Sequence, residues 1–221
     1  MLFRSCCSYG LSEASPGVAF SRWNDPIEDR IAGLMWPLPG VSLRIRDPES
    51  GKDNPPGRSG EILVKGPSVM VGYYQLPEAT AAALDAEGWL ATGDLGVLEA
   101  DGRLRFIGRL KDIIRVGGEN VSPAEVEDLL LRHPDVTAAQ VVALPDARLG
   151  EVPVAYAALR TGASLDGAAL ITWARERIAG FKAPRHIGIV NGFEDVMTGS
   201  GKPQKTLLRQ RALVDFGKSG Q

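Results

Sequence analysis

Two charged side chains in the sequence lie in settings that could do chemistry. Asp94 follows a threonine and a glycine in Trp89-Leu-Ala-Thr-Gly-Asp-Leu-Gly96, and a carboxylate in that place can accept two charge-assisted hydrogen bonds from a vicinal diol. Lys202 ends Met197-Thr-Gly-Ser-Gly-Lys202, where flanking glycines favour a mobile loop whose ammonium can enter and leave a site. The structural alternatives are an Asx-type turn at Asp94 and a solvated lysine at position 202.

A third segment, Gly108–Pro123, combines a charged turn, a glycine pair and a helix start. The charged residues 109–112 interrupt an apolar strand pattern, which suits a turn between two strands or two domains. The pair Gly117-Gly118 opens the backbone for a tight turn or a close ligand. Ser122 and Glu125 have the spacing of a capping box, which predicts a helix that begins at Pro123.

The elements before residue 111 predict a small β-rich subdomain. Residues 41–46 alternate like an exposed strand, residues 61–65 read as a second strand, and residues 47–60 between them are rich in Pro, Gly, Asn and Asp. Tyr73 and Tyr74, which follow Gly72, fit either a Gly-Tyr-x motif or plain core aromatics. This part is assigned to residues 1–110.

The elements from residue 111 onward predict a compact α+β domain over residues 111–221. Its expected parts are a three-stranded sheet and flanking helices: helices near 123–132, 166–179 and 205–214, and strands near 136–144, 152–159 and 187–190. About 110 residues are enough for an independent core. The fold class predicted for the whole chain is therefore α+β.

Composition excludes several classes of function. Lys and Arg total 25 against 27 Asp and Glu, so the chain has no basic field for nucleic acid. The only cysteines, Cys6 and Cys7, are adjacent and match no metal-ligand spacing. No stretch has the length of a membrane span, and no signal peptide is recognisable, which favours a cytoplasmic protein. His133 and His186 are expected to be structural or surface residues.

These motifs together resemble the AMP-forming acyl-CoA synthetases of the adenylate-forming superfamily. Gly108–Pro123 is similar to the hinge motif of that family, Tyr9-Gly-Leu-Ser-Glu13 to its Tyr-Gly-x-Thr-Glu motif, the run that ends in Thr-Gly-Asp94 to its ribose motif, and the run that ends at Lys202 to its catalytic-lysine motif. The resemblance runs from about residue 5 to about residue 210. It implies that residues 1–110 are the end of the AMP-binding N-terminal domain and residues 111–221 the C-terminal domain.

The resemblance implies a nucleotide site in the first half of the chain. Asp94 would bind both ribose hydroxyls, with Arg109 contributing to the same site. Tyr9 would lie against adenine, Ser12 would supply the hydroxyl used against the α-phosphate, and Glu13 would help to hold Mg²⁺, a cation that prefers oxygen ligands.

The resemblance implies two further devices in the second half. Lys111 would be the hinge residue, and the loop Gly117, Gly118, Glu119 and Asn120 would line the channel through which the thiol of coenzyme A enters; a plain β-turn is the alternative for the glycines. Lys202 would be the catalytic cation. Val196 and Pro203 depart from the family pattern around that lysine.

The implied reaction has two steps. A carboxylic acid and ATP give acyl-AMP and pyrophosphate, and coenzyme A then gives acyl-CoA and AMP. Only eight residues precede Tyr9, so the chain is expected to lack the triphosphate-binding loop and the acyl pocket and to be inactive alone. An adenylation domain that loads a carrier protein, and an inactive remnant that binds a nucleotide or a partner, are the alternatives. The sequence leaves a homo-oligomer open.

Overall fold

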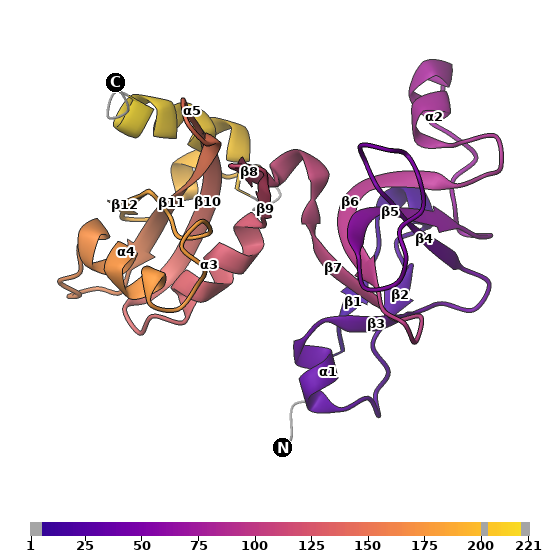
Figure 1. Cartoon of the computed structure of the whole chain (residues 1–221), viewed down its shortest axis with the longest axis horizontal. Helices are drawn as coiled ribbons and strands as arrows, with labels where there is room; N and C mark the ends of the chain where they lie inside the picture. The colour runs from indigo at the N-terminus through magenta and orange to yellow at the C-terminus, as the bar shows by residue number, and fades with distance from the viewer. Residues whose placement is uncertain (1–5, 200–202, 218–221) are drawn as a thin grey trace. The chain divides into compact units, whose positions relative to one another are not determined.

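The computed structural model describes residues 6–199 and 203–217 of the chain. The polypeptide divides into two compact units, residues 1–111 and residues 112–221, which are coloured indigo to magenta and rose to yellow in Figure 1. Each unit has its own sheet and its own core.

The first unit is built on an antiparallel sheet in the strand order β1-β2-β3-β7-β6-β5-β4. The strands are β1 (Ser8–Tyr9), β2 (Ala19–Phe20), β3 (Leu34–Pro37), β4 (Ser42–Arg46), β5 (Ser59–Lys65), β6 (Leu90–Leu98) and β7 (Leu104–Arg109). Residues Gly60–Val64 of β5 are all buried, so the sheet is covered on both faces at this strand. Two short helices, α1 (Ile27–Ile31) and α2 (Pro77–Ala83), lie in its connections.

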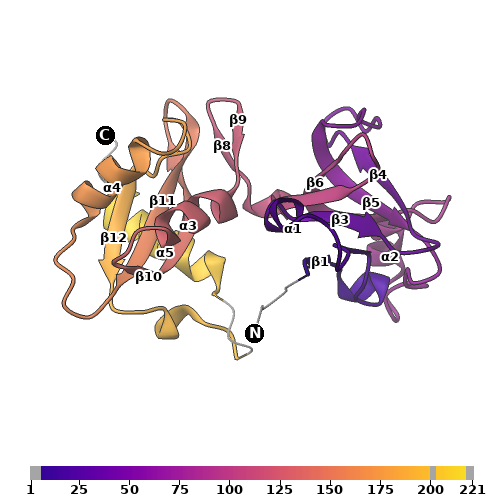
Figure 2. The ribbon, with the colours of Figure 1, turned by 90° about the horizontal axis from the view of Figure 1, so that it is seen from below.

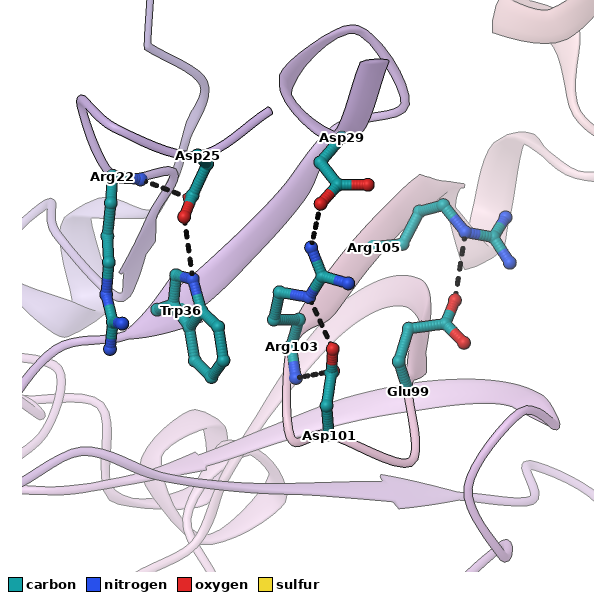
Figure 3. A network of polar contacts seen from close by, with 8 residues as sticks. All are labelled: Arg22, Asp25, Asp29, Trp36, Glu99, Asp101, Arg103 and Arg105. Carbon is teal, nitrogen blue, oxygen red and sulfur yellow. Dashed lines mark hydrogen bonds and ion pairs between the residues drawn. The ribbon is translucent and has the colours of Figure 1, made fainter. Parts of the chain in front are cut away.

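A polar network fastens α1 and the preceding turn to the sheet of the first unit (Figure 3). The guanidinium of Arg103 binds Asp29 of α1 at 2.7 Å and Asp101 of its own hairpin at 2.7 Å. The Trp36 ring lies 4.1 Å from the guanidinium carbon of Arg22 and 5.6 Å from that of Arg103. Such contacts stabilise an aromatic ring that is only partly covered by apolar groups.

The second unit contains a mixed sheet in the order β10-β11-β8-β9, with β12 parallel to β11. Its strands are β8 (Ile114–Val116), β9 (Glu119–Val121), β10 (Val136–Asp146), β11 (Gly150–Leu159) and β12 (His186–Val190). β10 and β11 form one long antiparallel hairpin, and β8 joins β11 only at the pair Val116 and Gly150. Figure 2 shows β8 and β9 as a narrow two-stranded ribbon.

Helices cover both faces of this sheet (Figure 1). α3 (Pro123–Leu131) and α4 (Gly167–Arg175) pack on one face, and α5 (Lys205–Phe216) packs on the other. Successive residues of β11 therefore alternate between two cores, with Ala155 and Ala157 toward α3 and α4, and Val154 and Tyr156 toward α5. This double coverage explains why β10 and β11 are almost continuously apolar in the sequence.

The predicted α+β class is confirmed, and several details differ from the sequence expectations. The sheet of the second unit has two more strands than the three expected, because the ribbon β8–β9 joins it. The side-chain cap predicted for Ser122 is wrong, because this side chain makes no capping hydrogen bond. Glu125, the other residue of the predicted capping box, binds the Lys182 ammonium at 2.7 Å. Asp166 does cap α4, accepting from the Ala169 N–H at 2.8 Å. No helix within the described ranges is long and apolar enough to cross a membrane.

Both histidines have structural contacts. His133 meets the edge of the Trp173 ring and accepts a hydrogen bond from the Asp135 N–H. His186 stacks on Phe216, and burial lowers the pKa of its imidazole. Cys6 and Cys7 are free thiols, and Cys7 Sγ donates to the Arg30 carbonyl.

Candidate nucleotide site

Asp94 and Arg109 lie directly opposite each other on neighbouring strands. β6 and β7 pair them as Cα partners, and a β-bulge follows at Leu95 and Gly96. Gly93 before Asp94 has φ +69°, a left-handed conformation that glycine adopts without strain. This local geometry ends the regular ladder and brings the carboxylate and the guanidinium to the same place.

Asp94 is a buried carboxylate with two protein partners. Its side chain is 8% exposed; Oδ2 accepts a hydrogen bond from the Tyr9 hydroxyl at 2.9 Å, and Oδ1 lies 3.6 Å from Arg109 Nε. Burial raises the pKa of the Asp94 carboxyl, while the Tyr9 hydrogen bond and the Arg109 charge act in the opposite direction. Each carboxylate oxygen can accept more than one hydrogen bond, so Asp94 retains acceptor capacity for a ligand.

Tyr9 is the buried hydrogen-bond partner of Asp94. Its ring is 6% exposed and stacks on Phe106 with 5.5 Å between ring centroids. Burial, as the largest cause, raises the pKa of the phenol far above its usual value, so the hydroxyl remains a donor. The structure shows the contact of Tyr9 with Asp94. The expected contact of Tyr9 with adenine stays a prediction, and little of Tyr9 is open to a ligand.

A pocket of about 300 Å³ lies beside this pair. It is lined by Leu11, Glu13, Tyr73, residues 90–94 and residues 109–111. Glu13 accepts a hydrogen bond from the Tyr73 hydroxyl at 3.1 Å. Ser12 is exposed in the 3₁₀ turn Ser12–Ala14 that precedes Ser15. The structure thus brings Glu13, Asp94 and Arg109 to one pocket, with Ser12 beside Glu13 in the chain.

The carboxylate of Glu13 fits the chemistry of a magnesium ligand. Mg²⁺ is held in many enzymes by one or two carboxylates together with substrate phosphates and water. Among the described residues there is no group of three or more His, Cys, Asp or Glu that could hold a metal alone.

The glycine pair of the second unit forms the turn of the β8–β9 ribbon. Gly117 has φ +59° and Gly118 has φ +93°, the positive values that a two-residue type I′ hairpin turn requires. Glu119 and Asn120 follow as exposed residues of β9. The turn alternative thus accounts for both glycines, and the thiol-channel role of Gly117–Asn120 stays a prediction.

A second pocket, of about 390 Å³, lies next to this turn within the second unit. Its lining includes Gly117 and Glu119, the Phe181 ring, and three arginines: Arg148, Arg175 and Arg185. Guanidinium groups suit phosphate, and an aromatic ring suits a heterocyclic base. This cluster is not recognisable in the sequence, because its members come from separate loops, from β9 and from the end of α4.

The two predicted lysines differ in what the structure shows. Lys111 is exposed in the 3₁₀ turn Leu110–Asp112, at the boundary between the two units, and it lines the first pocket. Lys202 lies outside the described residues. The hinge role of Lys111 and the catalytic role of Lys202 stay predictions.

Three supporting residues of the first site were not recognised in the sequence. Thr92 Oγ1 donates to the Ile62 carbonyl and accepts from the Asp94 N–H, and the buried Glu61 carboxylate accepts from the Gly93 N–H. Tyr73, weighed as a core aromatic, is instead 36% exposed and binds Glu13. Only the doublet Tyr73-Tyr74 offered a signal, since the other contacts depend on strand register.

Comparison with known proteins identifies the family of the chain. The sequence profile of the AMP-binding enzyme family matches residues 3–74, and that of the AMP-binding enzyme C-terminal domain matches residues 125–202. Feruloyl-CoA synthase of Amycolatopsis sp is 41% identical over 204 residues, which are 92% of this chain and 40% of that protein.

Two solved structures are similar in fold. ATP-bound MatB from Rhodopseudomonas palustris aligns with a TM-score of 0.83 at 34% identity, over 94% of this chain and 40% of MatB. The amide bond synthetase McbA from Marinactinospora thermotolerans aligns with a TM-score of 0.81 at 38% identity, over 93% of this chain and 42% of McbA.

The chain therefore belongs to the AMP-binding family of adenylate-forming enzymes. Its curated relatives include acyl-CoA synthetases, and it spans about two fifths of their length, 38% and 40% for the first two.

Proposed function

We propose that this chain supplies the AMP-holding part of an acyl-CoA synthetase. In this reaction a carboxylic acid and ATP form acyl-AMP, and coenzyme A then displaces AMP. The observation that carries the proposal is the buried Asp94, which the Tyr9 hydroxyl contacts at 2.9 Å and Arg109 Nε at 3.6 Å beside an open pocket. A nucleotide ribose presents the vicinal diol that such a carboxylate can accept from.

Within this proposal the residues have distinct tasks. Asp94 accepts from the ribose hydroxyls, and Arg109 keeps the carboxylate ionised and adds a donor at the same place. Glu13, together with the nucleotide phosphates, would hold Mg²⁺, which would offset the negative charge that develops during adenylation. Lys202 is the proposed second cation, and in a complete enzyme Lys202→Ala is expected to lower the adenylation rate by about 10²–10³.

Binding of AMP to the full chain tests the ribose assignment. Asp94→Asn keeps the shape of the side chain and removes its charge, and a hydrogen bond to a charged group is worth about 1.5–3 kcal/mol. We expect AMP to bind at least about tenfold more tightly than 2′-deoxy-AMP to the unmodified chain, and the ratio to fall below about threefold in Asp94→Asn. Calorimetry or NMR titration measures both ratios.

Asp53→Asn is the matched control. It removes a carboxylate from the same unit that binds Arg44 at 2.7 Å and is 47% exposed, away from the residues that line the pocket. It should leave the discrimination between AMP and 2′-deoxy-AMP unchanged. Undiminished discrimination in Asp94→Asn would show that another group holds the ribose.

Coenzyme A is the proposed acceptor because of the second pocket. The arginines Arg148, Arg175 and Arg185 with Phe181 match the phosphates and the adenine of coenzyme A. The alternatives differ in the acceptor: a carrier protein, or an amine, as the name of the amide bond synthetase indicates for that relative. Tighter binding of coenzyme A than of free pantetheine, lost in Arg185→Ala, supports the first assignment.

A further inference from the structure

The loop that contains Lys202 is closed at its base by hydrogen bonds. We define the loop base as Val196, Met197, Pro203 and Gln204. Met197 and Pro203 form an antiparallel bridge. The Gln204 N–H donates to the Val196 carbonyl at 2.7 Å, and its Nε2 donates to the Met197 carbonyl at 3.0 Å. Val196 itself is 6% exposed in the core under α5, so the departing end of the loop is fixed in the body of the second unit.

The returning end of the loop is fixed by a lysine at the start of α5. Lys205 Nζ donates to Glu127 Oε1 of α3 at 2.9 Å and to the Val141 carbonyl of β10 at 3.3 Å. The same Glu127 oxygen accepts from the Val141 N–H at 2.8 Å. One carboxylate therefore connects α3, β10 and the first residue of α5.

Local helix stability does not explain a lysine at this position. The N-terminal turn of a helix carries partial positive charge, which disfavours a cation, and the first turn of α5 has no acidic residue of its own to compensate. The Lys205 and Glu127 side chains are 25% and 16% exposed, so both lose most of their water. A cation at the start of a helix departs from the usual charge preference, which suggests that the pair of Lys205 and Glu127 has a role other than stabilising α5.

We propose that Glu127 and Lys205 are positioning residues that hold the loop base on the second unit, and that the catalysis proposed for Lys202 depends on this anchor. This inference rests on the proposed catalytic role of Lys202, which lies three residues before Lys205 in the sequence. Without the pair, the start of α5 loses its contact with α3 and β10, and the hydrogen bonds of Gln204 open more often. The adenylation step proposed to depend on Lys202 is then expected to slow.

Hydrogen exchange of the Gln204 amide in the full chain tests the anchoring. We expect Glu127→Gln and Lys205→Met to accelerate this exchange by at least about tenfold, because each removes a charge-assisted bond. Core amides of β11, such as that of Val154, should exchange at an unchanged rate. Lys205→Arg, which keeps the positive charge, should restore most of the protection.

Glu125→Gln is the matched control on the same helix. It breaks another lysine pair of α3, in which Lys182 Nζ lies 2.7 Å and 2.8 Å from the two Glu125 oxygens, and it should leave the Gln204 amide unaffected. Unchanged Gln204 exchange in Glu127→Gln, or equal acceleration of Gln204 and the β11 core, would overturn the proposal.

A kinetic measurement separates positioning from folding. In a complete synthetase that contains this chain, Glu127→Gln should lower the kcat of adenylation by about tenfold and leave KM for ATP within about twofold. Thioester formation from supplied acyl-adenylate should be spared, and an equal loss there would refute the positioning role. Failure of the unmodified chain to bind AMP would refute the proposed function alone, since exchange at Gln204 decides the anchoring without any nucleotide.

Discussion

Removal of the Tyr9 hydroxyl gives a quantitative test of the buried site. Tyr9→Phe keeps the ring and its stacking on Phe106 but takes one donor from Asp94, whose side chain is only 8% exposed. Water cannot easily replace that donor, and a hydrogen bond to a charged group contributes about 1.5–3 kcal/mol. We expect the free energy of unfolding of the first unit to fall by that amount at neutral pH.

The loss should depend on pH, with a sign that follows from the pKa of Asp94. Burial raises the folded-state pKa of the Asp94 carboxyl, and the Tyr9 hydrogen bond opposes this rise. Ionisation of Asp94 therefore lowers the stability of the folded state as the pH rises through the folded-state pKa. Tyr9→Phe should therefore raise the pKa further. Below about pH 3, under the unfolded-state pKa of about 3.9, Asp94 is protonated in both states, and the difference should shrink to about 0.5–1.5 kcal/mol, as for a neutral hydrogen bond.

Urea unfolding followed by tryptophan fluorescence measures this difference. Trp23, Trp36 and Trp89 belong to the first unit and Trp173 to the second, so a Trp173→Phe background reports the first unit alone. Tyr156→Phe in the second unit is the matched control, followed through Trp173 in a chain that keeps this tryptophan, because Tyr156 donates at 2.9 Å to Asp215, whose side chain is 40% exposed and can be rehydrated. A pH-independent loss, or a loss no larger than a few tenths of a kcal/mol, would show that the Tyr9 contact does not stabilise the ionised carboxylate.

Three further predictions follow from single residues. Gly118→Ala should destabilise the second unit by about 1–2 kcal/mol in denaturant unfolding, because φ is +93° there. Gly180→Ala, with open space and no positive φ, should be neutral or slightly stabilising in the same assay, and equal losses would contradict the turn argument. Asp166→Ala should lower stability by about 1 kcal/mol through loss of the α4 cap, and an unchanged urea midpoint would show that the cap does not matter.

The secondary structure of the second unit was predictable because its apolar pattern is strong and local. The expected helix at 123–132 is α3 (Pro123–Leu131), and the strands expected at 136–144 and 152–159 are the cores of β10 and β11. Both strands are buried on both faces, so their runs of Val, Ala and Leu leave little ambiguity. The helix expected near 166–179 is observed as α4, which spans only Gly167–Arg175 and has Glu176 as its C-cap residue.

Contacts between distant residues were not predictable. Tyr9 and Asp94 are 85 residues apart, and their meeting depends on the order of seven strands and on the bulge after Asp94. Glu125 has the spacing of a capping residue, yet it binds Lys182, 57 residues away. A charged side chain chooses among all partners within reach in the fold, and the sequence shows only the nearby ones.

The burial of the Asp94 carboxylate affects both the stability of the first unit and the binding of a ligand. Burial opposes the charge of this carboxylate, and Glu13 and Glu61 add to that effect. In Asp94→Asn the neutral amide can still accept from Tyr9 through its oxygen, so this variant should be more stable than the unmodified chain at neutral pH while it loses ribose selectivity. A ligand diol that donates hydrogen bonds to Asp94 would stabilise the buried negative charge. This stabilisation would add to the binding energy, and it is available only because the free site keeps the carboxylate away from water.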